Sequence, residues 1–124
     1  MTQPTSATLG KQAEDVALRY LLQKGLRLLT RNYRGPAGEI DLVMDQRGTL
    51  VFVEIRYRRA ARFGGAGESV DSRKRARLVA TALDYLQRHR EAAKCPIRFD
   101  VVAVGGLAEK ASIDWIADAF RHDG

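Results

Sequence analysis

The sequence predicts an α/β protein in which a mixed β-sheet is flanked by helices, with elements in the order α-β-β-β-α-β. Two observations support this class. Apolar residues recur at helical spacing near residues 9–24 and 71–92, whereas the segments that follow each of them are alternating or rich in β-branched residues. At 124 residues the chain has the length of one domain, and no internal repeat suggests a second.

The first helix is expected over about 9–24, because its apolar residues line one face and Gly25 follows where a C-terminal cap belongs. That face consists of Ala13, Ala17, Tyr20 and Leu21. Residues 1–8 are mostly polar and include one proline, which predicts a flexible arm. After the helix, "LRLLTRNYR" is predicted to form a first strand, which Pro36 and Gly38 end.

Two further strands are predicted as a hairpin, at about 38–45 and 49–58, because alternating residues flank the turn-like "DQRG". Its apolar face consists of Ile40, Leu42, Val51, Val53 and Ile55. If this face is buried in the core, Asp41 and Glu54 lie together on the other face. They are then opposite or diagonal neighbours, with Cβ atoms roughly 4.5–8 Å apart.

Two carboxylates this close repel each other and must be neutralised by a proton, a basic partner or a divalent metal. One interpretation is that Asp41 and Glu54 form solvated ion pairs, for example with Arg56 or Arg58. A metal site is favoured instead, because the apolar run "VFVE" leads straight into the acid and bases follow at once. Oxygen ligands without Cys or His suit Mg²⁺ or Mn²⁺.

The second half of the chain continues with "AARFGGAGES", a glycine-rich loop that we interpret as a flexible flap. A long helix is expected over 71–92, with a stripe made of Leu78, Val79, Ala82, Leu83 and Leu86. "IRFDVVAVGG" is predicted to be a strand, in which Asp100 forms a structural ion pair. "ASIDWIADAF" is a final element whose type stays open; its Trp115 and Phe120 are expected in the core or in an oligomer contact.

Composition favours a polyanionic partner, because 21 Lys and Arg against 15 Asp and Glu give a formal net charge of +6. Cys95 is the single cysteine, which excludes an internal disulfide and a thiolate metal cluster. The opening residues lack a signal-peptide pattern, and no apolar run approaches the ~20 residues that a membrane span requires. A cytoplasmic protein without membrane association is expected.

Basic residues gather around the predicted hairpin and second helix. Bases at the start of a helix oppose the macrodipole, which suggests a phosphate partner there. Others precede the glycine-rich loop or flank Tyr33, an aromatic residue on which an unpaired base can stack. The predicted nucleic-acid contacts are Arg34, Arg58, Arg59, Arg62, Arg73, Lys74, Arg75 and Arg77.

Several separated motifs, "TRNYRG", "GEIDLV", "LVFVEIRYR" and "SVDSRKRARL", resemble in order the YraN-like family of uncharacterised bacterial proteins. That family is similar to the PD-(D/E)xK nucleases, which have the restriction-endonuclease fold and include archaeal Holliday junction resolvases. The resemblance implies that Asp41 and Glu54 are metal ligands, joined by the backbone carbonyl of Ile55 and by Glu14 from the first helix. The motif places a lysine where this chain has Arg56, which stays protonated and so cannot act as a general base.

The sequence therefore predicts one restriction-endonuclease-like domain over 1–124, which binds nucleic acid and acts as a metal-dependent endonuclease with Mg²⁺ or Mn²⁺. In an active site, Arg56 would have an electrostatic role. DNA is favoured over RNA, and the resolvase likeness suggests branched DNA. The alternatives are a nucleic-acid-binding module that has lost the chemistry, consistent with Arg56, and a structural adaptor whose basic surface meets an acidic protein. Pairing of two chains into a homodimer stays open.

Overall fold

The computed structural model describes residues 5–58, 71–106 and 110–121. Its elements are α1 (Ser6–Gln23), β1 (Arg27–Gly35), β2 (Gly38–Gln46), β3 (Thr49–Arg58), α2 (Ser72–Arg88), the short 3₁₀ helix η2 (Ala92–Lys94), β4 (Ile97–Gly105) and β5 (Ser112–Phe120). The predicted α/β class and the order α-β-β-β-α-β are confirmed. The final segment, whose type the sequence left open, is a fifth strand.

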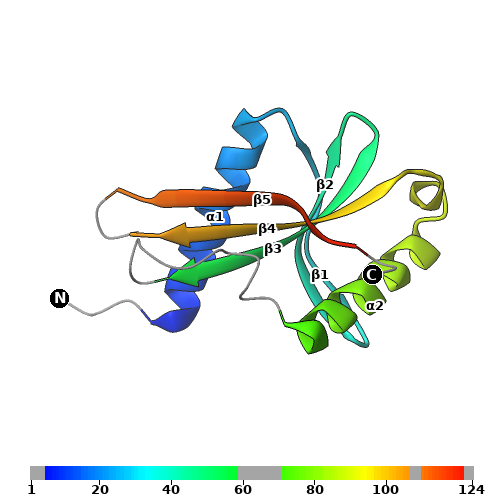
Figure 1. The fold of residues 1–124 in the computed structure, drawn as a ribbon, viewed down its shortest axis with the longest axis horizontal. Coiled ribbons are helices and arrows are strands. Elements are labelled where there is room, and N and C mark those ends of the chain that lie inside the picture. The colour runs from blue at the N-terminus through cyan, green and yellow to red at the C-terminus, as the bar shows by residue number, and fades with distance from the viewer. Residues whose placement is uncertain (1–4, 59–70, 107–109, 122–124) are drawn as a thin grey trace.

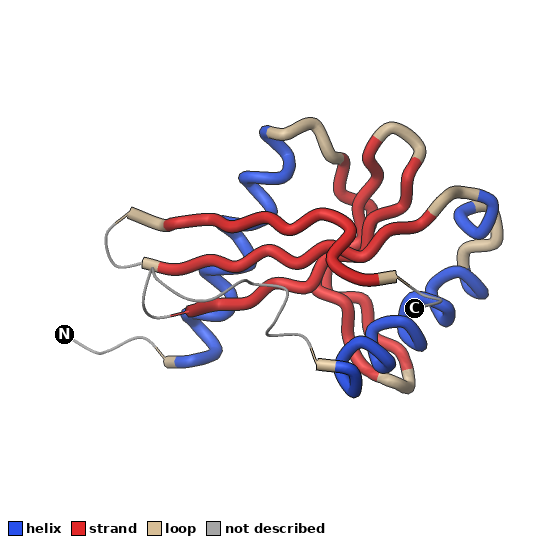
Figure 2. The backbone as a smooth tube through the Cα atoms, in the orientation of Figure 1, coloured by secondary structure: helices blue, strands red, loops and turns tan. Residues whose placement is uncertain are grey.

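The five strands form one mixed sheet in the order β1-β2-β3-β4-β5. β3 and β4 are parallel, with α2 in the connection between them, and the other neighbouring strands are antiparallel. α1 crosses behind β3, β4 and β5 (Figure 1). The sheet is strongly twisted, so that β1 and β2 run across the direction of β4 and β5 (Figure 2).

The helix ends follow from their capping residues. The Thr5 hydroxyl accepts a hydrogen bond from the Thr8 backbone N–H at 3.1 Å, so α1 begins at Ser6. Residues 6–8, predicted to belong to the flexible arm, are therefore helical, and residues 1–4 of that arm lie outside the described residues. At the other end Gly25 has φ of 97° and allows the Leu26 N–H to bond the Leu21 carbonyl, as predicted for a glycine cap.

The second helix is shorter than predicted. It begins after Asp71, whose carboxylate accepts a hydrogen bond from the Lys74 N–H at 2.9 Å. It ends at Arg88 instead of reaching residue 92, and η2 then takes up Ala92–Lys94. The predicted stripe is buried in part: Leu78 and Ala82 lie in the core, whereas Leu83 is 43% exposed.

Two apolar clusters cover the two faces of the sheet. On the α1 side, Leu42 and Val53 pack with Ala17 and Leu21 of the helix. On the α2 side, the cluster includes Phe52 together with Leu78 and Ala82 of that helix. The register between β2 and β3 pairs Leu42 with Val53, so these two residues share one face of the hairpin, as alternation predicts.

The predicted apolar face of the hairpin is wrong for one residue, Ile40. Ile40 packs in the α2-side cluster with Val43, whereas Leu42 packs on the α1 side. Strict alternation therefore breaks between Ile40 and Leu42, which lie on opposite faces of the sheet. The break occurs where β2 stops pairing with β3, because the register between them ends at Leu42 and Val53. Beyond that point β2 no longer follows the pleat of its neighbour.

Asp100 on β4 is the centre of a buried polar network. It is 1% exposed and pairs with Arg98 through two hydrogen bonds of 2.8 and 2.9 Å, which confirms the predicted structural ion pair. It also accepts bonds from the Trp115 indole N–H and the Asp118 backbone N–H, both at 2.9 Å. Trp115 packs against the α1-side cluster and Phe120 is in the core, as predicted for these two residues.

Within the described residues, no helix combines the length and the apolar character that crossing a membrane requires.

Asp100→Ala should lower the free energy of unfolding by about 3 kcal/mol, because it leaves Arg98 and two part-buried N–H donors without their acceptor. Urea denaturation followed by circular dichroism measures this change. Arg121→Ala is the matched control, since it removes an exposed ion pair with Asp118 and should cost less than about 0.5 kcal/mol. Equal costs for the two variants would contradict the role given to Asp100.

Candidate functional site

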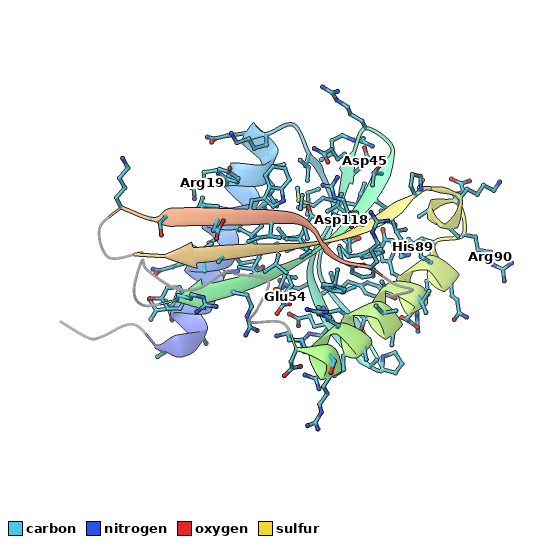
Figure 3. All side chains as sticks on the ribbon, in the orientation of Figure 1. Arg19, Asp45, Glu54, His89, Arg90 and Asp118 are labelled. Carbon is cyan, nitrogen blue, oxygen red and sulfur yellow. The ribbon has the colours of Figure 1, made fainter. Side chains whose placement is uncertain are left out.

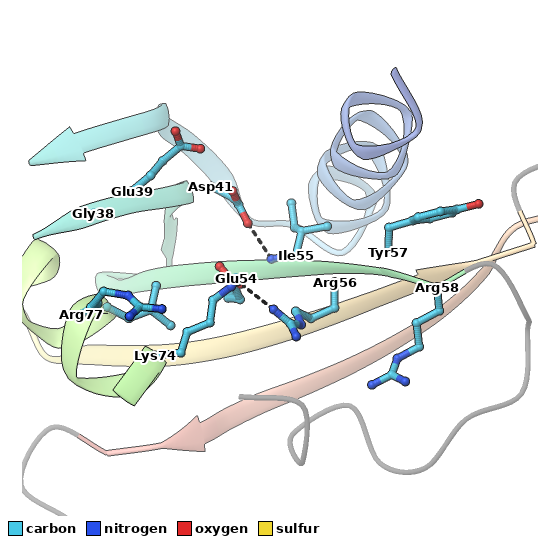
Figure 4. Close-up of a pocket in the computed structure, with 11 residues that line it drawn as sticks. Gly38, Glu39, Asp41, Glu54, Ile55, Arg56, Tyr57, Arg58, Lys74 and Arg77 are labelled. Atoms are coloured by element: carbon cyan, nitrogen blue, oxygen red, sulfur yellow. Dashed lines mark hydrogen bonds and ion pairs between the residues drawn. The ribbon is translucent and has the colours of Figure 1, made fainter. Parts of the chain in front are cut away.

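The site lies where β2 and β3 separate. Beyond the Leu42–Val53 pair, the Ile55 backbone N–H donates a hydrogen bond to the Asp41 side-chain Oδ2 at 2.8 Å (Figure 4). In an extended strand the N–H and C=O of one residue point toward the same neighbouring strand. The Ile55 carbonyl therefore faces the same gap as the Asp41 carboxyl.

Glu54 lies beside this gap, near the centre of the molecule (Figure 3), and only 6% of it is exposed. The Lys74 ammonium from α2 lies 2.6 Å from Glu54 Oε2, and an Arg56 guanidinium nitrogen lies 3.5 Å from the same oxygen. The buried Glu54 carboxylate is thus held by one close and one longer ionic contact.

The two acids interact strongly. Burial and the nearby Glu54 carboxylate raise the pKa of Asp41 from 3.8 to about 7, although the hydrogen bond from the Ile55 N–H acts in the opposite direction. The structure therefore brings together the two carboxyls that alternation places on one face of the hairpin. Their mutual repulsion favours any ligand that supplies positive charge.

A hollow of about 720 Å³ surrounds the acid pair. It is lined by Gly38, Glu39, Asp41, Glu54, Ile55, Arg56, Tyr57, Arg58, Lys74, Arg77 and Leu78. Two bases of β3, Arg56 and Arg58, and two of α2, Lys74 and Arg77, thus enter one hollow from different elements (Figure 4). An acidic centre with a basic lining matches a cation that is shared with a phosphate group.

A second hollow, of about 530 Å³, lies on the α1 side and shares Asp41 and Ile55 with the first. Glu14 lines it and adds to the raised pKa of Asp41 by charge repulsion. The Glu14 oxygens are held by Arg31 Nε at 2.6 Å and by Asn32 Nδ2 at 3.0 Å. Glu14 therefore faces the site, as its predicted role requires, and its assignment as a metal ligand stays a prediction.

Sequence reasoning did not identify the two residues that hold Glu14. The available signal was weak: Asn is one of the few residues that tolerate the left-handed backbone conformation, which Asn32 adopts with φ of 56°. It also missed that Lys74, predicted as a phosphate contact, reaches Glu54 directly.

The other predicted nucleic-acid contacts do not all converge. Arg34 is exposed and pairs with Glu39 at 2.9 Å, on the α1 side. Arg73 is exposed on the first turn of α2, and Arg75 lies over the Phe120 ring at 5.6 Å, away from the acid pair. Arg59, Arg62 and the glycine-rich loop lie outside the described residues.

The donor set fits a hard divalent cation held by few protein ligands. In residues 5–58, 71–106 and 110–121, no group of three or more His, Cys, Asp or Glu side chains is arranged to hold a metal. Asp41, Glu54 and the Ile55 carbonyl nevertheless offer only oxygen atoms beside one gap. Mg²⁺ commonly uses one or two carboxylates and keeps several waters, so this smaller set is sufficient.

Comparison with known proteins identifies the family. The model of "Uncharacterised protein family UPF0102" matches residues 13–104, so the chain belongs to this family and the resemblance drawn from its motifs is confirmed. A UPF0102 protein of Nitrosococcus oceani is 49% identical over 121 residues, covering 98% of each chain. One of Ralstonia pickettii is 50% identical over 125 residues, covering 98% of this chain and 96% of that one.

Among solved structures, the chain has a distant likeness to that titled "The structure of Pyrococcus Furiosus SfsA in complex with Ca2+". The TM-score is 0.40 and the sequence identity 13%, over 88% of this chain. The match spans 62% of that protein's length. This likeness is too distant to bear on the site.

Asp41→Asn should make the protein more stable at pH 8 but not at pH 4. The pKa of this carboxyl rises from 3.8 to about 7 on folding, so the folded protein binds more protons between these values and loses stability as pH rises through them. Asparagine keeps an acceptor for the Ile55 N–H but cannot ionise, and the gain at pH 8 should reach about 4 kcal/mol. Urea denaturation at both pH values measures this gain. A variant no more stable than the parent at pH 8 would refute the repulsion assigned to Asp41 and Glu54.

Proposed function

We propose that this UPF0102 protein is a metal-dependent phosphodiester hydrolase that acts on DNA. Asp41 and Glu54 would hold Mg²⁺ or Mn²⁺, with the Ile55 carbonyl as a third oxygen ligand. The observation that carries the proposal is the buried carboxyl pair inside a hollow whose other charged groups are mostly basic. Solubility alone does not require two acids to be held close together against their mutual repulsion.

The bound ion supplies Lewis-acid stabilisation of phosphate charge and lowers the pKa of water. The chain's own residues position that chemistry. Asp41 is fixed by the Ile55 N–H, and Glu54 by burial and its basic partners. Arg56 stays protonated and lies in the hollow, so it contributes positive charge to the phosphate and does not accept a proton.

Substrate binding is assigned to the bases that enter the hollow. Arg58 comes from β3 and Arg77 from α2, so a phosphate backbone that crosses the acid pair meets positive charge from two elements. DNA, including branched DNA, is the first substrate class to test because of the resemblance to junction-resolving nucleases.

The main rival is a DNA-binding module with this fold but without catalysis. The observation in its favour is Arg56, which stands where the PD-(D/E)xK motif has lysine and contacts Glu54 at 3.5 Å. The two functions differ in one measurable property: only the hydrolase converts its bound DNA in the presence of Mn²⁺.

Asp41→Asn should reduce Mn²⁺-dependent cleavage by about 100-fold or more, because loss of one carboxylate removes several kcal/mol of transition-state stabilisation. Its DNA affinity should be unchanged or raised, since a negative charge leaves a phosphate-binding hollow. The assay uses linear, flapped and four-way DNA with and without Mn²⁺. Asp45→Asn, on the same strand at the hairpin turn, is the matched control. Wild-type protein that binds DNA but cleaves none of the panel would establish the rival.

Arg77→Ala should weaken DNA binding at low salt and reduce the slope of log affinity against log salt concentration by about 1, as expected for one lost phosphate contact. Fluorescence anisotropy with a labelled DNA at several salt concentrations gives this slope. Arg90→Ala is the control. Arg90 is exposed and follows the C-terminal end of α2, far from Glu54 (Figure 3). Equal slopes for both variants would exclude Arg77 from the interface.

A further inference from the structure

Lys74 supplies positive charge to Glu54, one of the two acids that a bound cation would contact. Its Nζ lies 2.6 Å from Glu54 Oε2, closer than the 3.5 Å contact of Arg56 with the same oxygen. The side chain of Glu54 is only 7% exposed, so this ammonium is the main charge that compensates a nearly buried carboxylate. In Figure 4, Lys74 extends from α2 toward Glu54.

The backbone and the side chain of Lys74 differ in how they are held. Its backbone N–H is held by the Asp71 carboxylate at 2.9 Å, in the first turn of α2. Its side chain is 32% exposed and lines the hollow, where a substrate phosphate would enter. Lysine carries a compact charge on a flexible four-carbon stem, so the ammonium can change partners while the helix stays in place.

A divalent ion on Glu54 and the ammonium of Lys74 compete for the same carboxylate. Two cations this close repel each other strongly in a partly buried site. A metal that binds Glu54 Oε2, the oxygen that Lys74 contacts, must therefore displace the ammonium from it, and the freed ammonium remains within the same basic hollow.

We propose that Lys74 is an exchangeable counter-ion: it neutralises Glu54 in the metal-free protein, and metal binding transfers it from Glu54 to the substrate phosphate. This inference rests on the proposed metal-dependent function. It assigns Lys74 a role beyond general phosphate binding, because its release would couple loading of the ion to readiness for substrate. A lysine that only orients Glu54 as a ligand would behave differently, since its removal would weaken metal binding.

The test is direct titration of Mn²⁺ in the absence of DNA, by isothermal calorimetry at pH 8, above the raised pKa of Asp41. Lys74→Met should bind Mn²⁺ about tenfold more tightly than wild type, because the competing charge-assisted contact is gone. At saturating Mn²⁺ the same variant should cleave DNA more slowly. Lys94→Met, which removes an exposed lysine of η2, should change neither property.

Two further variants make each outcome decisive. Lys74→Gln is a second neutral substitution that should show the same tighter binding, and it serves if Lys74→Met fails to fold. Asp41→Asn should abolish the Mn²⁺ heat. If Asp41→Asn abolishes it but both Lys74 variants bind Mn²⁺ equally or less tightly than wild type, the exchange is overturned and the metal site stands. If wild type takes up no Mn²⁺, or Asp41→Asn binds it unchanged, the metal site and the exchange both fail.

Discussion

The separation of β2 from β3 is the constraint on which the site depends. Had the ladder continued past Leu42 and Val53, backbone hydrogen bonds would fill the gap where the acids lie. Instead the Asp41 side chain takes the Ile55 N–H that a backbone carbonyl would otherwise accept. This one bond satisfies a polar group at the edge of the opened hairpin, holds Asp41 beside Glu54, and leaves the Ile55 carbonyl facing the same space.

The electrostatics of the site are those of a strained arrangement that the rest of the fold maintains. Asp41 is held at a pKa of about 7 by burial and by the Glu54 charge, so the ionised pair opposes folding at neutral pH. The cost is offset by partners from separate elements: Lys74 from α2 and Arg56 from β3. Arg31 and Asn32 of β1 restrain Glu14 on the other side. Strain of this kind is typical of sites that bind a charged ligand, where stability is lost in favour of function.

Periodicity predicted the class of the fold and the central acid pair, because both depend on local patterns. The alternation of "LVFVE" survives in the structure, so Val51 and Val53 face α1 while Phe52 faces α2. It failed at Ile40, where β2 no longer pairs with β3 and strict alternation is not maintained. The same pattern left β5 unassigned because this strand is irregular. Asp118 has φ of 55°, and the register with β4 shifts between Phe99 and Val101.

The contacts across elements could not be derived in this way. Lys74 is separated from Glu54 by 19 intervening residues, and its reach depends on where α2 lies against the sheet. Helical spacing identifies the buried side of α2 but says nothing of its position along β3. The bond from Asn32 to Glu14 likewise requires a left-handed residue inside a strand, which local propensity disfavours.

Whether Asp41 and Glu54 share one ion is tested most directly by a crystal grown with Mn²⁺ and an anomalous difference map. One Mn²⁺ peak should lie within about 2.0–2.3 Å of a carboxylate oxygen from each acid, with the Lys74 ammonium moved away from Glu54. A peak that contacts only one of the two acids, or Mn²⁺ bound at another place while Lys74 still pairs with Glu54, would contradict the shared site.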